Sequence, residues 1–182
     1  MTLSREELAS RAAKIELLIL DVDGVLTDGT LYYSNDGIES KRFHVRDGSG
    51  LKLWQSLGKR AAVISGRTSA AVATRAAELG LSPVRQGCGA DKVPAFRAVM
   101  QETGVRPEQV CAVGDDLPDF PLLLNCGLAI AVGDACPDVR NVVHHVTAAH
   151  GGHGAVREAI EWLLTLTGQW PGMVDRFRTA VE

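Results

Sequence analysis

The sequence predicts one α/β domain built on a doubly wound, Rossmann-like parallel sheet. Short apolar runs alternate with helical segments along the chain, as is typical of parallel strands joined by right-handed crossovers. The first run, 17–20, is Leu-Leu-Ile-Leu, which indicates a strand buried on both faces of the sheet. The composition of the 182 residues, 46% hydrophobic and 23% charged, is that of a globular protein. We therefore expect a single domain spanning 1–182.

The elements follow from turn and capping signals taken in order. Ser4 and Glu7 form a capping-box pattern that opens a short helix through about Lys14. The expected strands of the sheet lie at 17–20, 61–64, 83–86, 110–113, 128–132 and 144–147. The further expected helices lie between or after these strands, at 51–57, 68–79, 90–103, 122–125 and 155–166. Gly58 can end the second of the predicted helices, and Thr68 or Ser69 can cap the third.

A small insertion follows the first strand. Strand-like runs at 30–33 and 39–45 flank Ser34-Asn35-Asp36-Gly37, and Asp-Gly between such runs predicts a β-hairpin. This insertion covers about 29–45, and no segment is long enough for a separate cap domain. Residues 46–50, Arg-Asp-Gly-Ser-Gly, indicate a second polar turn, and the tail at 168–182 is polar with a few apolar residues.

Composition excludes several classes of function. The formal net charge of -3 provides no basic field for a nucleic-acid partner. The polar N-terminus, 1–8, predicts neither a signal peptide nor a membrane span. No cysteine pair has CxxC spacing, so we expect neither a zinc site nor a disulfide framework, and reduced thiols favour the cytoplasm. The four cysteines are Cys88, Cys111, Cys126 and Cys136.

Polar groups follow the predicted strands at the edge where open α/β sheets bind ligands. Carboxylates such as Asp21 and Asp115 suit Mg2+, which prefers oxygen ligands. A lysine and a hydroxyl would hold phosphate oxygens, and a carboxylate can attack phosphorus while a second protonates the leaving oxygen. Gly24 and Gly66 let backbone N–H groups approach a phosphate. The residues that predict phosphoryl transfer are Asp21, Asp23, Ser65, Lys92, Asp115, Asp116 and Asp119.

Each of these residues also has a purely structural interpretation. Asp21 and Asp23 could cap a turn, and Ser65 could cap a helix, although Thr68 and Ser69 are already available for that purpose. A lysine at a helix N-terminus opposes the helix dipole, so Lys92 has little structural reason to be there.

The acidic residues at 115–119 and two arginines likewise have both a structural and a functional interpretation. One of Asp115 and Asp116 can cap the following helix, but the pair together with Asp119 exceeds what a cap needs. Arg46 and Arg67 could each reach a sugar-acid carboxylate or form surface ion pairs, and both alternatives stay open.

Four separated motifs carry a resemblance to a known superfamily. Asp21-Val22-Asp23-Gly24, Ser65-Gly66-Arg67, Lys92 and the segment 114–119 match in order the motifs of the haloacid dehalogenase superfamily. The segments 20–29, 43–48, 113–119 and 154–158 resemble more closely the 3-deoxy-D-manno-octulosonate 8-phosphate phosphatases, over roughly 15–166. This resemblance implies a capless haloacid dehalogenase-like fold and a cytoplasmic role in lipopolysaccharide synthesis.

The resemblance also implies roles for individual residues. Asp21 is expected to be the nucleophile that forms an aspartyl-phosphate, with Asp23 as general acid and then general base. The Asp21 carboxylate, the Asp23 backbone carbonyl and Asp115 would hold Mg2+. Ser65 and Lys92 would bind the phosphate, and Lys92 would also pair with Asp21.

Further residues and partners follow from the same resemblance. Asp119 and Asp116 would support the metal's waters or Lys92. Family members form homotetramers in which the hairpin, and often the C-terminal tail, closes a neighbour's site. The expected partners are therefore a phosphorylated sugar acid and copies of this chain.

Three alternatives concern the substrate and the activity itself. The family commonly has arginine where this chain has His153, which leaves the substrate open. Relatives that act on a nine-carbon, sialic-acid-like 9-phosphate tend to carry glutamate at the position of Arg67, so this chain favours the eight-carbon acid. Broad action on sugar phosphates is another possibility. Related domains appended to cytidylyltransferases suggest a non-catalytic tetramerisation module, against which the complete catalytic set argues.

Overall fold

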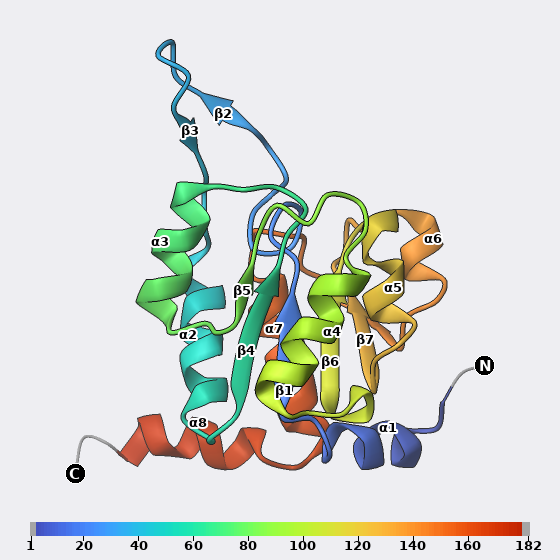
Figure 1. The fold of residues 1–182 in the computed structure, drawn as a ribbon. Coiled ribbons are helices and arrows are strands. Elements are labelled where there is room, and N and C mark those ends of the chain that lie inside the picture. The colour runs from blue at the N-terminus through green and yellow to red at the C-terminus, as the bar shows by residue number, and fades with distance from the viewer. Residues whose placement is uncertain (1–2, 180–182) are drawn as a thin grey trace.

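The computed structural model describes residues 3–179, so 180–182 of the predicted tail lie outside the described part. Six parallel strands form the central sheet in the order β5-β4-β1-β6-β7-β8 (Figure 1). The strands are β1 Leu17–Leu20, β4 Arg60–Ile64, β5 Val84–Arg85, β6 Val110–Gly114, β7 Leu128–Ala131 and β8 His145–Val146. Every residue of β1 is buried, and β1 pairs with β4 on one side and β6 on the other. The predicted doubly wound α/β fold is confirmed.

Helices cover both faces of the sheet, with α4 in front and α7 behind in the view of Figure 1. Their bounds are α1 Arg5–Ala12, α2 Val45–Gln55, α3 Ala70–Leu79, α4 Val93–Thr103, α5 Phe120–Leu123, α6 Pro137–Arg140, α7 Ala155–Leu166 and α8 Trp170–Thr179. Two 3-10 turns span Pro107–Gln109 and Leu117–Asp119. The capping box of α1 is present, and α1 ends two residues before Lys14. No helix among residues 3–179 is long and apolar enough to cross a membrane.

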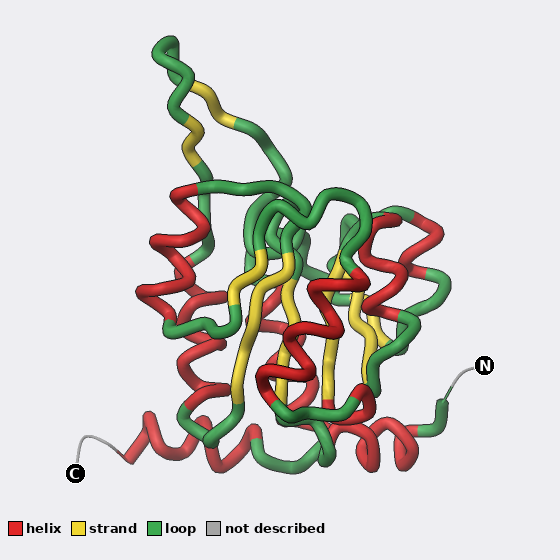
Figure 2. The backbone as a smooth tube through the Cα atoms, in the orientation of Figure 1, coloured by secondary structure: helices red, strands yellow, loops and turns green. Residues whose placement is uncertain are grey.

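The hairpin projects beyond the carboxyl ends of the strands (Figures 1 and 2). Its strands, β2 Tyr32–Tyr33 and β3 Glu39–Ser40, pair antiparallel, but they are shorter than the predicted runs at 30–33 and 39–45. The side chains of both strands are mostly exposed, so little packing stabilises a longer ladder. The predicted small hairpin insertion is therefore present with a shorter ladder.

The predicted polar turn at 46–50 is wrong, because these residues form the first turns of α2. The Asp47 carboxylate accepts hydrogen bonds from the backbone N–H groups of Gly154 and Arg157, at the beginning of α7. A Cβ atom at Gly50 would lie 3.1 Å from the Cα of Arg157. Gly50 therefore serves the close contact between α2 and α7, and local turn propensity yields to tertiary packing.

Two further boundaries differ from the prediction. The short helix expected at 122–125 is Phe120–Leu123 and follows the turn Leu117–Asp119, because Pro118 and Pro121 occupy first-turn positions where no N–H donor is needed. The tail contains a helix, α8, which the polar composition of 168–182 did not indicate. Met173 is buried, and α8 contacts α7 near the amino ends of the strands (Figure 1).

Candidate active site

Most of the predicted site residues meet in one cavity of about 260 Å3 at the carboxyl edge of the sheet. Its lining comes from the loops that follow β1, β4, β5 and β6, the third of which includes the residue preceding α4. This is where open α/β sheets place ligands, because the crossovers diverge there. The lining residues are Asp21, Asp23, Gly66, Arg67, Gly89, Lys92, Asp115, Asp116, Pro118 and Asp119.

Lys92 joins two of the carboxylates in the interior of the cavity. Its Nζ lies 2.6 Å from Asp21 Oδ1 and 2.7 Å from Asp119 Oδ1, and Lys92 is only 3% exposed. Burial by itself lowers the pKa of a lysine, but the charges of Asp21 and Asp119 outweigh it and raise the pKa of Lys92. Lys92 therefore carries a positive charge at neutral pH beside the predicted nucleophile.

Asp115 reaches the cavity from the end of β6 and lies against the loop after β1. Gly24 in that loop has φ of +100°, and a Cβ atom there would lie 2.1 Å from Asp115 Oδ2. Burial, followed by repulsion from Asp21 and Asp119, raises the pKa of Asp115 to about 8. The same two causes, burial and then Asp119, raise the pKa of Asp21 to about 6 despite Lys92. The cluster therefore has more negative charge than Lys92 can balance.

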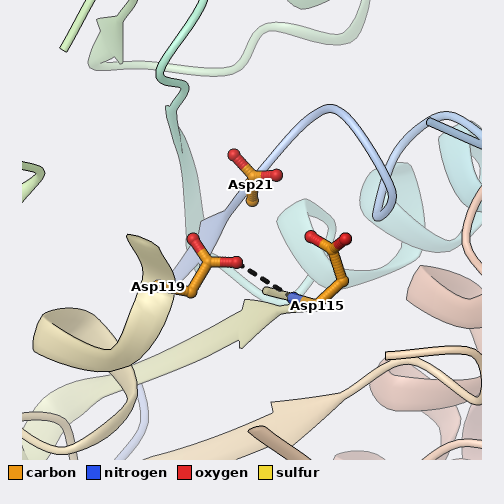
Figure 3. A group of neighbouring side chains, drawn as sticks. All are labelled: Asp21, Asp115 and Asp119. Atoms are coloured by element: carbon orange, nitrogen blue, oxygen red, sulfur yellow. Dashed lines mark hydrogen bonds between the residues drawn. The ribbon is translucent and has the colours of Figure 1, made fainter. Parts of the chain in front are cut away.

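This excess charge and the donor set fit a hard divalent cation. Carboxylate oxygens of Asp21, Asp115 and Asp119 all lie within 4.8 Å of one another (Figure 3). Both oxygens of Asp119 are already engaged, Oδ1 by Lys92 and Oδ2 by the backbone N–H of Asp115 at 2.9 Å. Asp21 and Asp115 are consequently better placed than Asp119 to hold such a cation.

Ser65, Gly66 and Arg67 lie at the end of β4 beside the same cavity. Ser65 is buried, and its Oγ accepts the backbone N–H of Arg67 at 3.3 Å. Gly66 borders the cavity directly, so its backbone is open to a bound group there. The N-cap residue of α3 is Ser69, whose side chain makes no capping hydrogen bond. Ser65 therefore does not occupy the capping position of α3.

Arg67 faces the stem of the hairpin across the cavity. Its Nη2 donates to Glu39 Oε2 at 2.7 Å and to the Tyr33 hydroxyl at 2.9 Å, while its Nε lies 3.9 Å from Asp23 Oδ2. Lys41 binds the other oxygen of Asp23. Neither Glu39 nor Lys41 was predicted as a site residue, although their spacing of two residues places both on one face of the strand predicted at 39–45.

The remaining predicted residues lie at or beyond the rim. Asp116 is exposed, lines the cavity and is the N-cap residue of the turn Leu117–Asp119. Arg46 is exposed on α2, and the structure does not bring it into the cavity lining. The Nε2 atom of His153 lies 3.1 Å from Arg42, which pairs with Asp28 at 2.6 Å. His153 therefore belongs to the hairpin stem rather than to the cavity.

Comparison with known proteins agrees with this fold and this arrangement of side chains. Residues 87–160 match the family model of the haloacid dehalogenase-like hydrolases. The 3-deoxy-D-manno-octulosonate 8-phosphate phosphatases of Yersinia pestis and Escherichia coli K12 are each 42% identical to this chain. The matches cover 87% and 90% of this chain and 84% and 86% of those proteins, respectively.

A solved structure shows the same likeness. The crystal structure of the Moraxella catarrhalis phosphatase of that name, in complex with magnesium, phosphate and KDO, has a TM-score of 0.90 and 37% identity. That match covers 94% of this chain and 98% of the other. The chain belongs to this family of phosphatases within the haloacid dehalogenase-like hydrolases.

Proposed function

We propose that this protein hydrolyses 3-deoxy-D-manno-octulosonate 8-phosphate, with Mg2+ as cofactor, through an aspartyl-phosphate on Asp21. The observation that carries the proposal is the contact of Asp21 with the buried Lys92 beside Asp115, at the carboxyl edge of β1. The relative from Moraxella catarrhalis, crystallised with magnesium, phosphate and KDO, supports the same substrate class. The proposal takes residues 1–182 as one domain with a hairpin insertion at 29–45 and a tail at 168–182.

In the proposed reaction an Asp21 carboxylate oxygen attacks phosphorus and forms a new P–O bond. The bond from phosphorus to the sugar oxygen breaks, and Asp23 gives its proton to that oxygen. Asp23 then takes a proton from water as the water oxygen attacks the phosphorus of the aspartyl-phosphate. The bond to Asp21 breaks, which releases phosphate and restores the Asp21 carboxylate and the protonated Asp23 carboxyl group.

The remaining residues of the cavity bind and orient the phosphoryl group. Lys92 holds the nucleophile through Asp21 Oδ1 and neutralises a phosphate oxygen, and the Ser65 hydroxyl and the backbone at Gly66 bind the others. Asp21, the Asp23 backbone carbonyl and Asp115 would hold Mg2+, which when bound neutralises negative charge on the transferring group. Asp119 and Asp116 support this arrangement, Asp119 through its contact with Lys92.

We propose that Arg67, and not Arg46, contacts the carboxylate of a sugar acid bound in the cavity of the same chain. Arg67 lines the cavity and stays partly exposed, whereas Arg46 lies outside the lining. Arg67→Met is expected to raise KM for carboxylated sugar phosphates by about tenfold, the value of one charged hydrogen bond, and to leave neutral sugar phosphates nearly unchanged. Arg46→Met is the matched control, and an equal effect of both changes would contradict this assignment.

We also propose that four copies of the chain assemble and that the hairpin closes a neighbour's site. The hairpin extends beyond its own cavity and exposes apolar side chains, Leu31, Tyr32, Tyr33 and Ile38. Such side chains are typical of a surface buried in an assembly. The four free cysteines among the described residues favour a reducing compartment, so we place the enzyme in the cytoplasm.

The experiment that tests this function is phosphate release from a panel of substrates, with Mg2+ and with EDTA. The panel contains the eight-carbon and nine-carbon acid phosphates, hexose phosphates and nucleotides. Metal-dependent preference for the eight-carbon acid is expected. Preference for another phosphate would overturn the substrate, and no release from any member by folded, Mg2+-loaded protein would favour a non-catalytic assembly module.

A further inference from the structure

Lys41 connects the stem of the hairpin to Asp23. Its side chain is 1% exposed, and its Nζ forms an ion pair with Asp23 Oδ1. The same Nζ lies 3.4 Å from Glu39 Oε1, and the other oxygen of Glu39 is held by Arg67. A fully buried lysine side chain is costly unless its charge is paired, and Glu39 provides that pairing also while Asp23 carries the proton it gives to the leaving group.

The Asp23 carboxylate has a cation beside each of its oxygens. Lys41 is on Oδ1, and the Arg67 Nε is 3.9 Å from Oδ2. Asp23 follows β1 and is bordered by residues of the hairpin, Lys41 above all, rather than by a strand of the sheet. Its direction is therefore set by the hairpin stem, in contrast to Asp21, whose direction is set by Lys92 and the sheet.

We propose that Lys41 is a positioning residue that orients the Asp23 carboxylate toward the oxygen of the leaving group. The inference rests on the proposed function, in which Asp23 gives its proton to that oxygen as the P–O bond breaks. Lys41 itself exchanges no proton and acts only through its contact with Asp23 Oδ1. Glu39 and Arg67 complete the arrangement, because Glu39 holds Lys41 and Arg67 together at the stem.

Leaving groups of different basicity distinguish this role from a purely structural one. A sugar alkoxide is strongly basic and departs only with a proton, whereas 2,4-dinitrophenolate departs without one. The ratio kcat/KM reports steps up to departure of the leaving group, so it excludes the later attack of water. Loss of the Lys41 contact should therefore lower kcat/KM for the sugar phosphate and spare that for 2,4-dinitrophenyl phosphate.

The test compares Lys41→Met, Lys41→Arg and Arg42→Met in the Mg2+-loaded full chain. Arg42 is the matched control, since it neighbours Lys41 but pairs with Asp28, away from Asp23. Lys41→Met is expected to lower kcat/KM for the sugar phosphate by about 10–100-fold, the cost of a misplaced acid, and that for 2,4-dinitrophenyl phosphate by less than about threefold. Lys41→Arg should restore most of the loss, and Arg42→Met should leave both ratios near those of the unaltered enzyme.

The opposite results overturn the inference. Equal losses on both substrates, or equal losses in Lys41→Met and Arg42→Met, would mean that Lys41 only holds the hairpin in place. Unchanged kinetics in Lys41→Met would exclude any role in the reaction. If the unaltered enzyme hydrolyses neither substrate, the proposed function fails and the inference fails with it, which is distinct from a variant that fails alone.

Discussion

The two ends of the sheet each have a cavity, but they differ in how their charges are balanced. The cavity at the amino ends of β4 and β5 is the larger, at about 360 Å3 against 260 Å3 for the candidate active site. Two of its polar side chains donate to backbone carbonyl oxygens: Gln55 to Leu79 O at 3.0 Å, and Arg60 to Thr103 O at 3.0 Å. At the carboxyl ends, several carboxylates face one lysine, which raises the pKa values of Asp21 and Asp115. Unbalanced charge, rather than volume, therefore distinguishes the end of the sheet where we place the reaction.

The largest expected effect is the loss of the nucleophile at the charged end. Asp21→Asn should lower phosphate release by at least about a thousandfold, because the amide cannot form the aspartyl-phosphate. Asp138→Asn, in exposed α6, is the control and should keep full activity. Initial rates of phosphate release in Mg2+ measure the activity of both variants. Normal turnover by folded Asp21→Asn would contradict a catalytic role for the carboxyl end of the sheet.

Gly24→Ala tests whether the close approach of the loop after β1 to Asp115 is needed to position the Asp115 carboxylate. The new Cβ would lie 2.1 Å from Asp115 Oδ2, so we expect Mg2+ affinity and kcat to fall by about 10–100-fold. Gly37→Ala is matched to it, because Gly37 also has positive φ, +81°, but no atom within 4 Å of the added Cβ. Titration of activity with Mg2+ separates them, and equal losses would mean that backbone strain alone is responsible.

The unbalanced charge should also make the metal-free protein less stable as pH rises from 6.5 to 8. The pKa of Asp115 is about 8 in the folded state and near 3.8 in the unfolded state, so the folded protein binds more protons in this window. The free energy of unfolding therefore declines until the pH exceeds the folded pKa. Each kcal/mol lost lowers Tm by roughly 2–4 °C in a protein of this size.

Calorimetry in EDTA at several pH values measures this decline in stability. The Asp115→Asn variant should show a flatter Tm profile, and Mg2+ should offset the decline in the unaltered chain because it binds the ionised carboxylate. A Tm that rises between pH 6.5 and 8 without metal, or identical profiles for the two proteins, would contradict the assigned charge imbalance.

The smallest effect is expected at the amino end. Arg60→Met removes the hydrogen bond to Thr103 O at an exposed position and should change kcat and KM by less than about twofold. Tm should change by only a few degrees, as for most surface substitutions. A large loss of activity with a normal Tm would show that the larger cavity takes part in the reaction.

Sequence patterns indicated the sheet and the cluster of polar residues at its carboxyl edge, because both depend on short stretches of neighbouring residues. The apolar run 17–20 indicated a buried strand, and the residues that follow parallel strands lie at one edge of the sheet. Asp21, Lys92 and Asp115 therefore meet in the structure as their places after strands or before a helix suggest. The predicted chemical roles of these residues await the experiments above.

Tertiary structure alone decided the features that depend on contacts between distant segments. Residues 46–50 have the composition of a turn, yet Asp47 becomes helical because it binds the N–H groups that begin α7, more than a hundred residues away. The contact of Lys41 with Asp23 depends on the direction in which the hairpin leaves the sheet, which no local propensity specifies. The sequence by itself determined which groups reach the carboxyl edge, because strand periodicity is local. Their charge balance was decided only by packing, since burial and proximity set it.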